Sequence, residues 1–171
     1  MNKKSGFTLA EVLVTLMIIG VIASMTVPSL MQNTAQQEYK AALKKAVSTL
    51  NQAVAMNYAL DGEDASAYTG TSFVTLMKKR MNVAEAGSNY VYTADGIYYQ
   101  AGTGGNCSFN SEDTDGTETA CVTMTVDVNG RKGPNKYTAS TDKVYDIYTL
   151  NVYPQKVLPK DSVTQKVLFM K

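Results

Sequence analysis

A single acid, Glu11, lies inside a long apolar run near the start of the chain. Residues 7–27 contain no other charged side chain. An acid at the centre of a membrane is unfavourable by about 2.5–3.5 kcal/mol, so such a residue is usually paired or functional. Two interpretations follow. The carboxylate pairs with a cation, or it lies in the first turn of a helix, where the helix dipole favours it by about 0.3–1 kcal/mol.

Catalysis by the chain itself is poorly supported. The sequence has no histidine, which excludes Ser-His-Asp and Cys-His sites and metals bound by histidine. A glycine-rich phosphate loop followed by Lys and Ser or Thr is also absent. We therefore predict that the protein is not an enzyme.

The two cysteines, Cys107 and Cys121, are 14 positions apart. Both follow the apolar run, on the side that we expect to lie outside the cytoplasm, where thiols oxidise. A disulfide between them would add about 3 kcal/mol of stability by the loop-entropy argument. The alternative is two unrelated thiols, and the disulfide is the favoured prediction.

The segment between the cysteines gathers acids in the sequence EDTDGTE, residues 112–118. Asp113, Asp115 and Glu118 are weak candidates for calcium ligands, because calcium prefers oxygen ligands and Gly116 permits a tight turn. The spacing lacks a complete EF-hand loop, and an acidic surface loop is the simpler interpretation. No other cofactor is expected.

The apolar run that contains Glu11 is long enough to cross a membrane. Residues 7–27 number 21, and a helix needs about 20 to span the hydrocarbon layer. Lys3 and Lys4 precede the run, and basic flanking residues tend to stay cytoplasmic, which predicts one span with the rest of the chain outside. In a secretory signal the cut follows the apolar region, whereas here the plausible cut lies before it.

Residues 6–11, GFTLAE, and the apolar run that closes at Pro28 resemble the prepilin motif of type IV pilins and type II secretion pseudopilins. The resemblance implies that a membrane prepilin peptidase cuts between Gly6 and Phe7 and methylates the new amino group of Phe7. It also implies that this amine pairs with Glu11 of a neighbouring subunit when the helices bundle in a filament. Ala10 departs from the branched aliphatic residue that usually precedes this Glu.

Gly20 and Pro28 interrupt the apolar run, and both residues lower the stability of an isolated helix. Transmembrane helices tolerate both as kinks. In assembled pili of the family the helix is often partly unwound between the corresponding glycine and proline. By analogy, Gly20 and Pro28 are predicted to give this helix flexibility.

Residues 29–60 predict an amphipathic continuation of the helix. The segment lacks glycine and proline, and the helix is expected to stop at Asp61 and Gly62. The expected apolar stripe consists of Tyr39, Leu43, Val47, Leu50, Val54 and Leu60.

The remaining residues, 61–171, predict one small β-rich head. We expect a hairpin over residues 90–93 and 97–99, strands over 122–128 and 145–153, a short helix over 73–81 and a turn over 127–135. The tail, residues 163–170, is expected to form a last strand or to lie loosely. The strand tyrosines are attributed to core packing.

The fold class is therefore predicted to be α+β: a long N-terminal helix packed on a small antiparallel β-sheet head, as in pilins. The expected divisions are a cleaved leader (1–6), a transmembrane and filament-core helix (7–28), an amphipathic helix (29–60) and the head (61–171).

The function that the resemblance implies is a structural subunit of a type IV pilus-like or type II secretion pseudopilus filament. The alternatives are a minor or tip pseudopilin, or a competence pilus subunit, that binds cargo or DNA, and, in another class, a membrane-tethered binding domain that never polymerises. A nucleic-acid surface is disfavoured, because the bases are scattered and residues 61–120 hold nine acids against three bases.

The expected partners are other filament subunits, the prepilin peptidase, membrane lipid and an inner-membrane assembly platform with a cytoplasmic ATPase. The expected location is the bacterial inner membrane, with the head outside the cytoplasm. From there the subunit would pass into a cell-surface or periplasmic filament.

Overall fold

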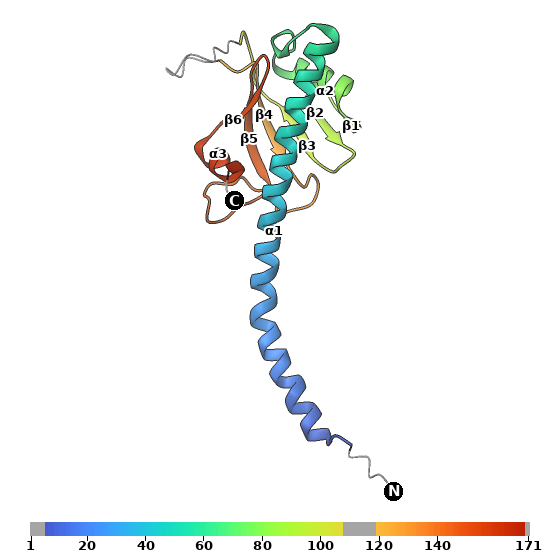
Figure 1. Ribbon diagram of the computed structural model, residues 1–171, viewed down its shortest axis with the longest axis vertical. Helices are drawn as coiled ribbons and strands as arrows, with labels where there is room; N and C mark the ends of the chain where they lie inside the picture. Colours follow the sequence, from blue (N-terminus) through green and yellow to red (C-terminus); the bar gives the residue numbers. More distant parts are fainter. Residues whose placement is uncertain (1–5, 108–118, 170–171) are drawn as a thin grey trace. The chain divides into compact units, whose positions relative to one another are not determined.

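The computed structural model describes residues 6–107 and 119–169. The chain divides into two compact units, Met1–Gln37 and Glu38–Lys171. One helix of 53 residues, α1 (Leu9–Asp61), supplies most of the first unit and the start of the second (Figure 1). It ends where the sequence predicts, since Gly62 has a φ of 72° and its N–H donates to the Tyr58 carbonyl at 3.0 Å.

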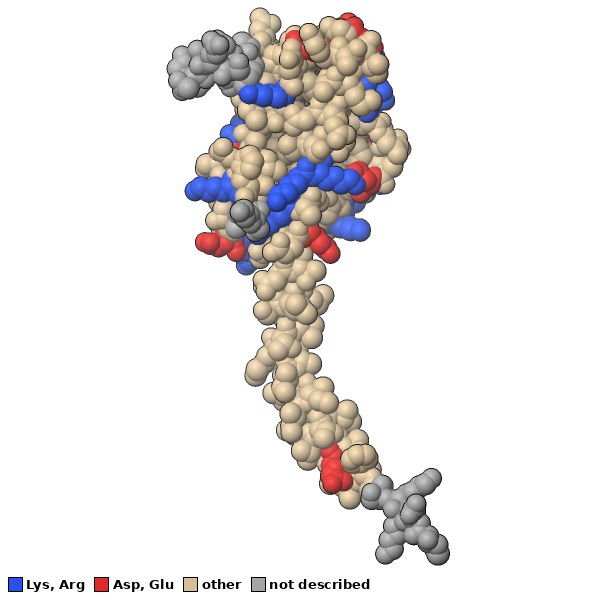
Figure 2. Space-filling view, viewed as in Figure 1, with Lys and Arg blue, Asp and Glu red and all other residues tan. Residues whose placement is uncertain are grey.

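In the first unit, α1 continues through Gly20 and Pro28 without a break. Its large apolar side chains are exposed around the whole circumference, as four consecutive residues demonstrate: Leu16, Met17, Ile18 and Ile19 are between 55% and 73% exposed. By length and composition this helix can cross a membrane. Figure 2 shows the segment almost entirely in the colour of uncharged residues.

In the second unit, α1 covers one face of a β-sheet and contributes a stripe of side chains to the core (Figure 1). Leu43, Leu50 and Val54 are fully buried, and Val47 is nearly so. Leu60 is 66% exposed, so its predicted place in the stripe is wrong. The last buried residue of the helix is Asn57, whose amide donates to the Glu63 carbonyl at 2.8 Å.

The sheet has six strands in the order β1-β2-β3-β4-β5-β6, and every neighbouring pair is antiparallel. The strands are β1 (Val83–Ala86), β2 (Tyr90–Thr93), β3 (Tyr98–Ala101), β4 (Val122–Asp127), β5 (Ile147–Val152) and β6 (Val157–Pro159). Two short 3-10 helices, η1 (Ala65–Ala67) and η2 (Gly70–Ser72), and helix α2 (Phe73–Arg80) connect α1 to β1. The predicted α+β architecture, with its hairpin and short helix, is confirmed.

The tail differs from both expectations, because it forms a helix, α3 (Ser162–Phe169). Asp161 caps this helix: its carboxylate accepts the Thr164 backbone N–H at 2.7 Å and the Thr164 hydroxyl at 2.8 Å. Val167 is fully buried. The last strand is β6 instead, and Asn51 of α1 fixes it, since the Asn51 amide oxygen accepts the Val157 N–H at 2.9 Å.

A disulfide joins Cys107 to Cys121, as predicted. Cys121 is fully buried directly before β4, and its carbonyl accepts the Gly70 N–H at 3.1 Å. Gly104 lies so close that an added Cβ would meet the Cys121 carbonyl oxygen at 1.9 Å. The disulfide therefore adjoins a tightly packed backbone crossing that requires glycine.

The strand tyrosines divide between the two faces of the sheet, which corrects the core interpretation in part. Tyr99 and Tyr148 are buried in the core. Tyr90, Tyr92 and Tyr98 occupy the other face, where they are only half-buried, and the rings of Tyr90 and Tyr98 stack with centroids 5.4 Å apart. Strand position alone does not reveal which face a tyrosine occupies until the register is known.

Replacing Leu50 by Ala is expected to destabilise the second unit by about 2–5 kcal/mol, because it leaves a cavity between α1 and the sheet. The matched control is Gln52→Ala on the exposed side of the same helix, expected to stay within about 0.5 kcal/mol of the parent chain. The measurement is urea unfolding of the full chain in detergent, followed by the near-ultraviolet circular dichroism of tyrosine. Equal midpoints for the two variants would contradict the assigned packing of α1.

Candidate functional site

Glu11 lies in the first turn of α1 and closes a capping box with Thr8. The Oε2 atom of Glu11 accepts the Thr8 backbone N–H at 2.7 Å and the Thr8 hydroxyl at 2.8 Å. In return, the Thr8 hydroxyl oxygen accepts the Glu11 N–H at 3.3 Å. This reciprocal pattern satisfies donors that the start of a helix otherwise leaves unpaired.

The geometry leaves half of the carboxylate unused. Both bonds that Glu11 accepts go to Oε2, and Oε1 has no hydrogen bond within the described part of the chain. The helix-terminus interpretation of Glu11 and the cation interpretation are therefore compatible. One oxygen holds the helix start, and the other is free for a positively charged partner.

Phe7 lies beside this acid and is 89% exposed. Phe7, Glu11, Val12 and Thr15 line an open cavity of about 470 Å³ in the first unit. The structure thus brings together Phe7 and Glu11, the residues singled out for assembly, with Gly6 directly before them. Cleavage next to Gly6 and methylation of Phe7 remain predictions.

Hydroxyl side chains along the apolar part of α1 are satisfied within the helix. Thr15 donates to the Val12 carbonyl at 2.9 Å, Ser24 to the Val21 carbonyl at 2.7 Å and Thr26 to the Ile22 carbonyl at 3.1 Å. An environment without water requires such internal pairing of polar groups. Together with the exposed apolar surface, this pairing suggests that the helix anchors the chain in a membrane.

The residues predicted to give flexibility occupy two different environments. A Cβ added at Gly20 would meet nothing within 4 Å, so no close approach explains this glycine. Pro28 has no N–H, so the Ser24 carbonyl four residues earlier lacks its usual helical donor. The weak point of the hydrogen-bond ladder is therefore at Pro28, and the role of both residues in a filament remains a prediction.

The calcium candidates Asp113, Asp115 and Glu118 lie outside the described residues. In residues 6–107 and 119–169, no group of three or more His, Cys, Asp or Glu side chains is arranged to hold a metal ion.

A pair of carboxylates organises the loop after β4, which the sequence indicates only as a turn. Asp146 is fully buried and accepts the backbone N–H groups of Asn135 at 2.7 Å and Lys136 at 2.8 Å. Asp127 is 8% exposed and accepts the Asn129 N–H at 3.2 Å. Burial raises the pKa of Asp127 to about 6, with a smaller contribution from the negative charge of Asp146.

Sequence reasoning missed two residues of these sites. Thr8 was detectable, because Thr-x-x-Glu before an apolar run is the sequence pattern of a capping box. Asp146 was not, because nothing near it in the sequence links it to a loop that begins 18 positions earlier.

The N-terminal residues match a known family. Residues 1–27 match the family described as "Prokaryotic N-terminal methylation motif". The chain is also similar to proteins named "Type II secretion system core protein G". It is 48% identical to the one from Escherichia coli over 60 residues, which are 35% of this chain and 37% of that protein.

Two further relatives carry the same name. The Aeromonas hydrophila protein is 48% identical over 60 residues, and the Vibrio cholerae protein is 44% identical over 61 residues. Each alignment covers 37% of the relative, so the chain spans little more than a third of the length of the curated proteins that it matches. No solved structure matches the chain significantly.

Replacing Asp127 by Asn is expected to remove a pH dependence of the second unit's stability. The pKa of about 6 in the folded state lies above the ordinary value of 3.8, so the folded state binds this proton more tightly than the unfolded state. The resulting stabilisation is complete below about pH 4 and is lost as the pH rises through about 6. The free energy of unfolding should therefore rise by on the order of 1–2 kcal/mol from pH 7.5 to pH 5.

The measurement is urea unfolding of the full chain at both pH values. Asp127→Asn should have a higher free energy of unfolding than the parent at pH 7.5. Its free energy of unfolding should also change much less between pH 7.5 and pH 5 than that of the parent. Exposed Asp142→Asn is the matched control and should change neither quantity. A parent chain whose stability is flat between pH 5 and pH 7.5 would refute the assignment.

Proposed function

We propose that this chain is a structural subunit of a type II secretion pseudopilus or a related filament of the pilin and pseudopilin family, because residues 1–27 match the N-terminal methylation motif and about a third of the chain is similar to proteins named "Type II secretion system core protein G". The family is structural rather than enzymatic, in agreement with the absence of histidine and of a phosphate-binding loop from the sequence. The names of the relatives favour the pseudopilus over other filaments of the family.

One observation carries the proposal: the half-used carboxylate of Glu11 beside an exposed Phe7. Cleavage between Gly6 and Phe7 by a prepilin peptidase would leave a cationic amino group on Phe7. Methylation of that amine would keep its charge. In a bundle of parallel helices, the amine of one subunit would pair with the free Oε1 of Glu11 in a neighbour, while Oε2 keeps its bonds to Thr8.

The exposed apolar surface of α1 supports a helix that serves in two environments. Before assembly, lipid of the inner membrane would cover it, with the second unit outside the cytoplasm. After assembly, the same side chains would pack against those of other subunits in the filament core. Transfer between the two environments would require an assembly platform in the inner membrane and a cytoplasmic ATPase, because the sequence has no glycine-rich phosphate loop for nucleotide hydrolysis.

Replacing Glu11 by Gln tests the pairing without removing the cap. A glutamine oxygen can accept the bonds from Thr8 in the same capping box, so the start of the helix should persist while the negative charge is lost. Loss of one partner of a buried ion pair typically costs about 3–5 kcal/mol, so filament yield should fall at least about a hundredfold. The yield is the amount of this chain in the filament fraction that is sheared from the surface of cells overproducing the protein.

Mass spectrometry of the N-terminal peptide tests processing in the same samples. The expected mature chain begins at methylated Phe7, both for the parent and for Glu11→Gln in membranes. Thr8→Val is the companion variant: it removes the hydroxyl from the cap, retains the charge of Glu11 and should reduce filament yield less than Glu11→Gln does. Filaments at parental yield from Glu11→Gln would exclude the ion pair, and an uncut chain confined to membranes would exclude the filament subunit.

A further inference from the structure

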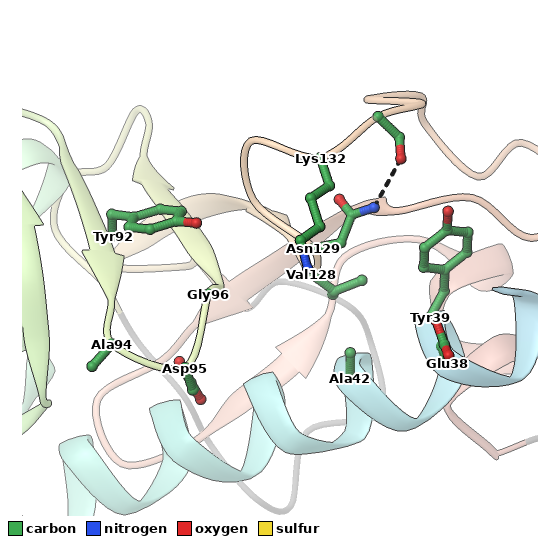
Figure 3. Close-up of a pocket in the computed structure, with 11 residues that line it drawn as sticks. Glu38, Tyr39, Ala42, Tyr92, Ala94, Asp95, Gly96, Val128, Asn129 and Lys132 are labelled. Carbon is green, nitrogen blue, oxygen red and sulfur yellow. Dashed lines mark hydrogen bonds between the residues drawn. The ribbon is translucent and has the colours of Figure 1, made fainter.

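A polar cavity opens in the second unit at the point where α1 enters it. The cavity measures about 570 Å³ and lies between α1, the β2–β3 hairpin and the loop after β4. Figure 3 shows Tyr39 and Tyr92 on opposite sides, with Asn129 and Lys132 between them. Its size is that of a typical binding pocket.

Two of the charged side chains in this cavity have no partner. Within residues 6–107 and 119–169, the Glu38 carboxylate and the Lys132 ammonium group make no hydrogen bond or ion pair. Asp142, which does not line the cavity, is the other acid without such a partner in these residues. Asp95, which also lines the cavity, is paired with Lys45 at 2.8 Å. The cavity therefore presents one free carboxylate and one free ammonium group.

The wall that carries Lys132 is held rigidly. Asn129 donates to the Gly133 carbonyl at 3.1 Å, and Asp146 binds the backbone where the loop ends. Arg131, the residue before Lys132, is anchored outward by its ion pair with Glu85 and its position 5.2 Å from the centre of the Tyr92 ring. A preorganised loop lowers the entropy that binding would cost.

We propose that this cavity is a docking site for a second copy of the chain in the filament, with Glu38 and Lys132 as its charged contacts. The inference rests on the proposed function. The cavity is lined by Glu38, which directly follows in the sequence the exposed helical residues of the first unit that filament packing would cover. A second copy can supply both signs of charge, because its described residues include the exposed lysines Lys78 and Lys160 and the exposed Asp142.

Charge reversal tests the role of Lys132. Lys132→Glu is expected to lower the yield of sheared filaments about fivefold or more at physiological salt, the effect of losing roughly 1 kcal/mol per contact. Lys143→Glu is the matched control, because Lys143 is an exposed lysine outside the cavity and should keep the parental yield. Thermal unfolding of both variants in detergent should match the parent, which separates docking from folding. Equal filament yields for the two variants would overturn the proposal.

Photo-crosslinking in the full chain tests the occupant. Benzoylphenylalanine in place of Ala94, an exposed residue of the cavity, should give a crosslinked dimer of the chain in assembled filaments. The same probe in place of Gln100, exposed on β3 and outside the cavity, should give at most a tenth of that dimer. Filaments without a dimer from position 94, or with a crosslink there to a different protein, would overturn the docking site and leave the filament function intact. Failure of the parent chain to form filaments would overturn the proposed function itself.

Discussion

Apolar surface without a partner inside the chain is the constraint on which the rest of this structure depends. Burial of apolar area stabilises a protein by about 25 cal/mol per Å², so a helix segment with no buried side chain must find its cover elsewhere. Lipid and other helices are the two covers that match its chemistry. Both require that polar groups along the helix be satisfied internally, and the bonds of Thr8, Thr15 and Ser24 do this.

Glu11 illustrates how one side chain can meet two requirements at once. A carboxylate has two oxygens, and this one directs both of its bonds within the chain through Oε2. A residue that was fully satisfied within its own helix would gain little from a partner, and one that was wholly unsatisfied would be costly to place in a membrane. Because the two oxygens are divided in this way, Oε2 is satisfied within the single chain and Oε1 can still bind a cation.

The sequence predicts those parts of the fold that depend on local pattern. The apolar run and the helical spacing after it located α1, strand-type residues bounded by turns located β2 to β5, and the isolated pair of cysteines indicated the disulfide. The parts that were missed depend on contacts distant in sequence. β6 is three residues long and is held by Asn51, 106 positions away, and Leu60 could not be distinguished from Leu50 without knowing where the sheet ends. The helical tail was recoverable in principle from Asp161 and Thr164, whose spacing is that of an N-cap.

The bond between Asn51 and Val157 has a consequence for the order of synthesis. Asn51 precedes Val157 by 106 positions, so the helix is synthesised well before the strand that it fixes. The bond can form only after β6 has been synthesised, and until then this end of the sheet lacks its contact with α1. During that interval the stripe of Leu43, Leu50 and Val54 is open to incorrect associations. Transiently exposed apolar surface of this kind makes a folding chain prone to aggregation until its long-range contacts form.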